Sequence, residues 1–170
     1  DMTPDAYASW CQSTRAVEIG SGPYPFLGRN RWKWAIAVDP LANGYQTEGL
    51  IPAECAHVAM IPATGEHIPL ADACCDLVVI ENCLDHVDSP DAVLREIHRL
   101  LRPGGLVWLL VDLMEHRDEM HPNPFNEQRL RDALSSSGFA TVKMRISSEN
   151  ASHPKAHAEC RALLDRKSVV

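Results

Sequence analysis

The apolar residues of this chain follow two patterns, short continuous runs and segments with helical spacing. Continuous runs predict strands buried on both faces of a parallel sheet. They cover residues 15–20, 35–39, 56–61, 75–80 and 106–113. Two further strands are expected over residues 141–146 and 157–164, joined by the polar loop 147–156.

Helical spacing is clearest after Ser89, where apolar residues recur every three or four positions through residues 93–101. Ser89-Pro90-Asp91 predicts the start of this helix, and Pro103-Gly104-Gly105 predicts its end. Shorter helices are expected over residues 3–12, 42–50 and 127–137, with a short irregular helix or loop over 24–34.

Strands that alternate with helices predict an α/β fold, a doubly wound sheet with helices on both faces. The length of 170 residues favours a single domain, residues 1–170. Within it we expect an N-terminal helix (1–13), a ligand-binding core (14–112) and a C-terminal helix with a closing strand pair (113–170). Ligands of such sheets bind at the carboxyl ends of the strands.

Charge and composition argue against several classes of function. The formal net charge of −7 argues against non-specific nucleic-acid binding, which needs a basic surface. No apolar run is long enough for a membrane span, and the N-terminus lacks the pattern of a signal peptide. The six cysteines form no C-x-x-C pair, which favours reduced thiols and a cytoplasmic location.

Polar and glycine residues follow the first two predicted strands. Gly20-Ser21-Gly22-Pro23 comes directly after the first strand, and Asp39 ends the second, nineteen positions beyond Gly20. Glycines allow close approach of a ligand, and a carboxylate at this place can accept both hydroxyls of a ribose. A plain tight turn and a solvated aspartate are the simpler alternatives. Pro25 stands where a dinucleotide fingerprint has its third glycine, which counts against NAD.

Six segments together resemble the class I S-adenosylmethionine-dependent methyltransferases of the small-molecule type. The resemblance covers about residues 16–112, and its parts are V-E-I-G-S-G-P from Val17, A-V-D-P from Ala37, G-E-H-I-P-L from Gly65, C-D-L-V-V-I from Cys75, L-D-H-V-D-S-P from Leu84 and L-R-P-G-G from Leu101. It implies a Rossmann-like sheet of seven strands, mostly parallel, with an antiparallel C-terminal strand. It also implies S-adenosylmethionine (AdoMet) as the cofactor.

The resemblance further implies a role for each matching residue. Glu18 would lie near the amino group of the methionine moiety, and Gly20, Ser21 and Gly22 would pack under the methionine and ribose. Asp39 would hold the ribose hydroxyls. The remaining implied contacts are Pro40 and Leu41 against the adenine, Thr64, Gly65 and Glu66 at the adenine edge, and Glu81 and Asn82 at the methionine end. Thr64 stands where many relatives carry an aspartate.

Methyl transfer from a sulfonium needs alignment of donor and acceptor more than it needs acid–base groups. A general base matters only where the acceptor must lose a proton, and His86, His116 and His121 are the candidates. His86 could instead tie the loop after the fourth strand to the next helix. His116 and His121 are five residues apart in a proline-rich loop, a poor metal-binding spacing, so no metal is expected.

Three classes of function follow. The first is an AdoMet-dependent methyltransferase that acts on an unidentified small-molecule acceptor by in-line displacement. The second is a methyltransferase-like binding or scaffold domain without catalysis, and the third is an NAD-type oxidoreductase. Only about a dozen residues precede the first strand, so we expect an open acceptor side that a homodimer mate or a large acceptor could cover.

Overall fold

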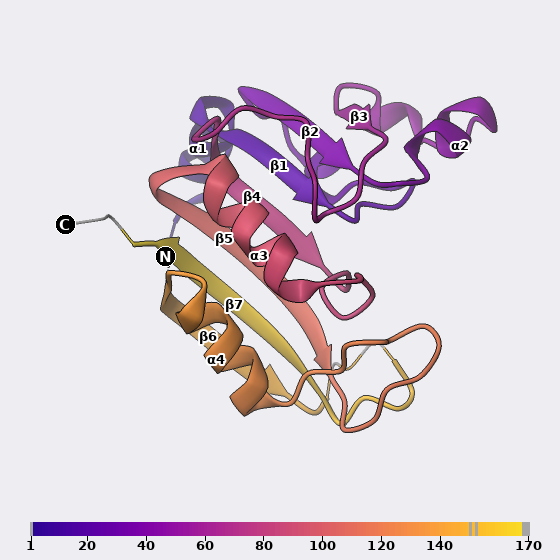
Figure 1. Ribbon diagram of the computed structural model, residues 1–170. Helices are drawn as coiled ribbons and strands as arrows, with labels where there is room; N and C mark the ends of the chain where they lie inside the picture. The colour runs from indigo at the N-terminus through magenta and orange to yellow at the C-terminus, as the bar shows by residue number, and fades with distance from the viewer. Residues whose placement is uncertain (1, 150, 152, 168–170) are drawn as a thin grey trace.

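The computed structural model describes residues 2–149, 151 and 153–167 and contains one seven-stranded sheet (Figure 1). The strand order is β3-β2-β1-β4-β5-β7-β6, and β7 runs antiparallel to the other six strands. The strands are β1 (Arg15–Ile19), β2 (Trp34–Val38), β3 (Ala59–Ile61), β4 (Cys75–Glu81), β5 (Leu101–Leu113), β6 (Phe139–Ser147) and β7 (Ala158–Arg166). The α/β class and the mostly parallel, seven-stranded sheet are confirmed.

The described helices are short, and they cover both faces of the sheet. They are α1 (Pro4–Ser13), η1 (Phe26–Arg29), α2 (Ala42–Thr47), η2 (Ala53–Cys55), α3 (Pro90–Leu100) and α4 (Glu127–Ser136). In α3 the Ser89 side chain accepts from the Ala92 amide, and Pro90 occupies the first turn, as the sequence predicts. The irregular segment after β1 forms only a four-residue 3-10 helix, η1.

The largest differences from the predicted strand boundaries are at the starts of β3 and β5. β3 begins at Ala59 rather than at residue 56, because the 3-10 helix η2 and the turn that follows it occupy the preceding residues. β5 begins at Leu101, which pairs with Cys75, whereas the next pair joins Leu77 to Leu106. Residues 102–105 therefore bulge out of the strand instead of separating it from α3.

The core lies on the two faces of the sheet. α3 and α4 pack on one face, where Val93, Leu94 and Ile97 of α3 are fully buried. On the opposite face Leu27 of η1 is buried, and Trp10 of α1 packs against the same cluster. The arrowheads of β1, β2, β4 and β5 end at one edge of the sheet (Figure 1), so the loops that follow these strands meet there.

None of the helices in the described part of the chain is long and apolar enough to cross a membrane. All six cysteines are free thiols, four of them buried.

Candidate active site

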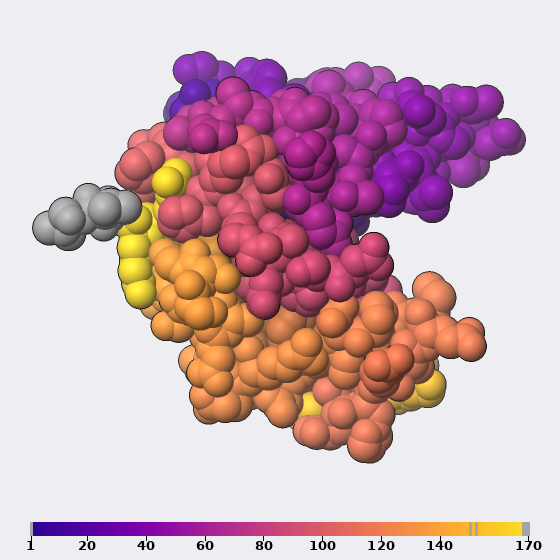
Figure 2. Space-filling view, in the orientation of Figure 1, coloured from indigo at the N-terminus to yellow at the C-terminus, as the bar shows by residue number. Residues whose placement is uncertain are grey.

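A cavity of about 470 Å³ opens at the carboxyl ends of β1, β2 and β4. Figure 2 shows this edge of the molecule hollowed between the N-terminal segments and the segments coloured orange. Nine residues singled out in the sequence line it, namely Gly20, Asp39, Pro40, Leu41, Thr64, Gly65, Glu66, Asn82 and His86. Its volume is in the range of small-molecule binding sites.

Gly20 lies where β1 meets the loop that follows β4. Its φ is +68°, and a Cβ on it would lie 2.2 Å from Cys83 Sγ and 2.6 Å from Cys83 Cβ. Glycine is therefore required here both by the backbone conformation and by the close approach of Cys83. Its amide donates to the Val38 carbonyl at 2.8 Å, which closes the turn onto β2.

Asp39 organises the turn at the bottom of the cavity. Its Oδ2 accepts from the Gly22 amide and its Oδ1 accepts from the Leu41 amide, both at 2.9 Å. The residue is 7% exposed and lines the cavity. Each carboxylate oxygen has a second acceptor site, so the side chain can still accept hydrogen bonds from a ligand.

The loop after β3 forms another wall of the cavity. The Oε1 atom of Glu66 accepts from the amides of Asp88 and Ser89, at 2.9 and 3.2 Å, so this carboxylate lies at the start of α3. A Cβ on Gly65 would approach Ile19 Cγ2 to 3.0 Å, which explains the small residue between the two walls.

Four predicted cofactor residues lie outside the cavity lining, namely Glu18, Ser21, Gly22 and Glu81. Side chains alternate between the faces of a strand, and Glu18 and Glu81 lie on the α1 side of the sheet. Glu18 accepts from the Phe26 and Leu27 amides at 2.9 Å, and Glu81 accepts from Trp108 Nε1 at 2.7 Å. Burial raises the pKa of Glu18 to about 7, although both amide donors lower it. Their implied contacts with a cofactor stay predictions.

A second cavity, of about 170 Å³, adjoins the first. Asn82 and His86 line both cavities, and Asp85, Asp112, His121 and His153 complete the second. The His121 ring lies between two others, with centroids 4.4 Å from His86 and 4.5 Å from His153. We call His86, His121 and His153 the histidine cluster.

Hydrogen bonds that involve backbone groups bring this cluster together from three loops. The Asn123 amide donates to the Asp85 carbonyl at 3.2 Å, and its side chain donates to the Val87 carbonyl at 2.6 Å. The His153 amide donates to Asp112 Oδ2 at 2.8 Å. His116, the third predicted catalytic histidine, is exposed and lines neither cavity.

Two carboxylates near the histidine cluster have pKa values that are shifted in opposite directions. Asp85 is 2% exposed, and its burial raises its pKa. Hydrogen bonds from His121 and Lys155 hold the pKa of Asp118 well below its usual range. Sequence reasoning missed Asp112, Asp118 and His153 as neighbours of the site. Asp112 near the end of β5 had a detectable signal in its strand-end position, whereas His153 had none.

Comparison with known proteins agrees with this geometry. The chain matches the family model described as a methyltransferase domain over residues 19–109, more than half of its length. It is 35% identical over 100 residues to the malonyl-[acyl-carrier protein] O-methyltransferase of Laribacter hongkongensis, which covers 52% of this chain and 34% of that protein. It is 44% identical over 50 residues to the ubiquinone/menaquinone biosynthesis C-methyltransferase UbiE of Rubrivivax gelatinosus, over 29% of this chain and 20% of that one.

These matches span about a third and a fifth of the two curated relatives. Among solved structures, the chain is similar to a SAM-dependent methyltransferase from Methanosarcina mazei. The TM-score is 0.74 at 14% identity, over 99% of this chain and 100% of the other. The shared fold therefore extends well beyond the segments that match in sequence.

Proposed function

The chain belongs to the methyltransferase domain family, and we propose that it transfers a methyl group from AdoMet to a small-molecule acceptor. One observation carries the proposal. The 470 Å³ cavity joins the glycine turn after β1 to the carboxylate of Asp39 after β2, at the edge of the sheet where such folds bind ligands.

The residues that line the cavity and those next to it would each have a separate role in binding AdoMet. Asp39 would accept the ribose hydroxyls, and Pro40 and Leu41 would pack against the adenine. Thr64, Gly65 and Glu66 would flank the adenine edge, and Gly20 and Asn82 would contact the methionine end. Glu18 and Glu81 would act from the opposite face, where they hold the backbone and Trp108. Ser21 and Gly22 would shape the turn, because Gly22 donates to Asp39.

AdoMet brings a methyl group already activated by the sulfonium charge. The chain then needs to hold the acceptor in line with that methyl group and to exclude water. His86 lies between the two cavities, so the smaller cavity would hold the acceptor next to the methyl donor. There His86 or His121 could take a proton from the acceptor, whereas the exposed His116 could contact only a larger one.

The two alternative functions are an NAD-type oxidoreductase and a non-catalytic binding domain. Pyrophosphate binding uses free amides at the start of a helix, and here Pro23 and Pro25 precede the four-residue η1. This disfavours an NAD-type oxidoreductase. A non-catalytic binding domain shares every feature of the cofactor cavity, so only turnover separates it from an enzyme. The relatives named above are an O-methyltransferase and a C-methyltransferase.

Calorimetric titration tests the cofactor. We expect S-adenosylhomocysteine (AdoHcy) to bind at one site per chain and NAD not to bind. Binding of NAD alone would overturn the proposal. Incubation of the protein and a cell extract with methyl-labelled AdoMet then tests turnover, because a labelled product seen by mass spectrometry identifies the acceptor. AdoHcy binding without any labelled product would favour the non-catalytic domain.

A further inference from the structure

The geometry points to a divalent transition-metal site formed by Asp85, His86 and His121, beside the cofactor cavity. The two histidines come from different loops, one after β4 and one after β5. Each of the three residues offers one ligand atom, and these atoms lie within 4.8 Å of one another. Ligands about 2.0–2.2 Å from one ion are at most about 4.4 Å apart, so a bound ion would need to draw the three side chains only slightly closer together.

Asp85 is the strongest single indication of a cation. It is 2% exposed, and among the described residues its Oδ1 has no hydrogen-bond partner. Among the described residues, the histidine nitrogen within ion-pair distance of this oxygen is His86 Nε2, at 3.8 Å, which is too far for a hydrogen bond. A buried carboxylate oxygen without a partner is costly, and a bound cation would remove that cost.

His121 is oriented as a metal ligand. Its Nδ1 lies 2.8 Å from Asp118 Oδ1, and Lys155 Nζ lies 3.0 Å from Asp118 Oδ2. A carboxylate on Nδ1 keeps the proton there and leaves the Nε2 lone pair for a metal. This pairing of a carboxylate with a ligating histidine is the usual outer shell of histidine–metal sites.

A competing group uses the same central histidine. Asp118, His121 and His153 also place their ligand atoms within 4.8 Å of one another. Asp118, however, is already engaged by His121, by the Met120 and His121 amides and by Lys155. We therefore assign the ion to Asp85, His86 and His121, and we assign Asp118 to the outer shell as a positioning residue.

The donor set indicates the type of ion and its use. Two imidazoles and one carboxylate suit Zn²⁺, Co²⁺, Ni²⁺ or Fe²⁺ better than Mg²⁺ or Ca²⁺, which prefer oxygen ligands. Three protein ligands leave a coordination position open for an exogenous group. With an ion bound, His86 and His121 would be its ligands and not general bases. If the proposed function holds, the open position would take an oxygen or nitrogen atom of the acceptor and orient it toward the methyl donor.

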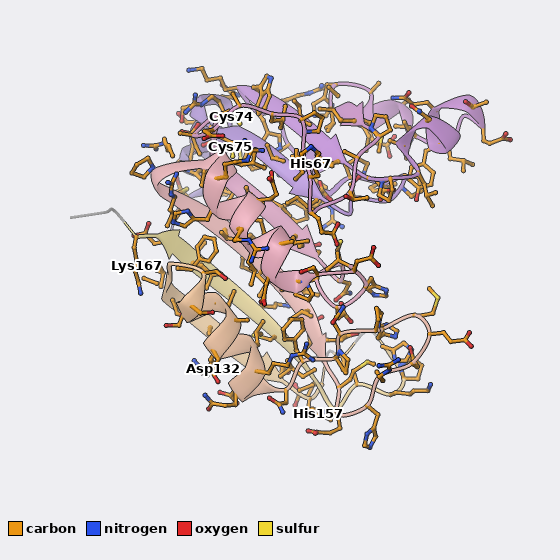
Figure 3. The ribbon with its side chains drawn as sticks, in the orientation of Figure 1. His67, Cys74, Cys75, Asp132, His157 and Lys167 are labelled. Atoms are coloured by element: carbon orange, nitrogen blue, oxygen red, sulfur yellow. The ribbon has the colours of Figure 1, made fainter. Side chains whose placement is uncertain are left out.

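Titration with Co²⁺ alone tests the site in the intact chain, because tetrahedral Co²⁺ gives visible absorption bands. We expect one equivalent to bind, and we expect D85N and H86Q each to weaken binding at least tenfold. H157Q is the matched control, since His157 lies in the loop before β7 outside both groups (Figure 3). H86Q alters an exposed side chain, so the test holds even if D85N fails to fold.

Three outcomes of the binding titrations would overturn the assignment. They are no binding of Co²⁺, equal loss of binding in H157Q, or unchanged binding in D85N and H86Q together with loss in H153Q. Sulfur-to-cobalt charge-transfer absorption would show that cysteine thiolates hold the ion instead. AdoHcy affinity, measured separately without metal, distinguishes failure of the metal site from failure of the proposed function.

Discussion

Replacement of Asp39 by asparagine tests the link between the fold and the cofactor cavity. Both carboxylate oxygens accept a backbone amide at 2.9 Å, Oδ2 from Gly22 and Oδ1 from Leu41. An asparagine amide group has only one acceptor oxygen. In either orientation its NH₂ group therefore faces a backbone N–H, and one of the two hydrogen bonds is lost.

The magnitude follows from the charge on the acceptor. Hydrogen bonds to charged groups contribute about 1.5–3 kcal/mol, so we expect D39N to lower the free energy of unfolding by about that amount. The same charge would accept the ribose hydroxyls, and its loss corresponds to a roughly 10- to 100-fold rise in the dissociation constant for AdoHcy. Urea unfolding measures the first quantity, and calorimetry measures the second.

D132N is the matched control. Asp132 lies exposed on α4 (Figure 3), where it accepts a Gln128 side-chain hydrogen bond at 2.9 Å. We expect its effect on stability to stay within about 0.5 kcal/mol, with AdoHcy affinity unchanged. The assignment of Asp39 to the ribose is refuted if folded D39N binds AdoHcy within twofold of the wild-type affinity.

Two further predictions concern residues around the cavity. G20A should lower the free energy of unfolding by at least about 1 kcal/mol more than G22A. Both glycines have positive φ, but only at Gly20 would the added Cβ clash, with Cys83. Equal losses of stability in urea unfolding would contradict this. The raised pKa of Glu18, about 7 against an ordinary 4.5, means that stability falls as pH rises between these values. This fall in the free energy of unfolding amounts to about 3 kcal/mol in total, and E18Q should abolish it. Identical pH profiles of stability for the wild-type protein and E18Q would contradict this.

The sequence predicted the fold well because the signals were local. Continuous apolar runs marked the parallel strands, and Ser89-Pro90 marked the start of α3. The family recognition is confirmed by the match over residues 19–109. Nine of the predicted site residues line the cavity, since most strand-end positions meet at one edge of the sheet. The boundaries of β3 and β5 were wrong, because a turn and a bulge depend on pairing with other strands.

The placement of Glu18 and of the histidine cluster could not be predicted in the same way. Motif order does not tell which face of β1 carries Glu18, which its amide partners on η1 settle. His86, His121 and His153 come from three loops far apart in the sequence, and Asn123 positions one of these loops through backbone contacts. Spacing along the chain carries no information about such long-range contacts, so the expectation of no metal rested on His116 and His121 alone.

A crystal structure of the chain with AdoHcy tests the central claim most directly. We predict AdoHcy in the 470 Å³ cavity, with both ribose hydroxyls on the Asp39 carboxylate and the sulfur atom on the side of Asn82 and His86. AdoHcy bound elsewhere on the chain, or in this cavity with its ribose away from Asp39, would contradict the account.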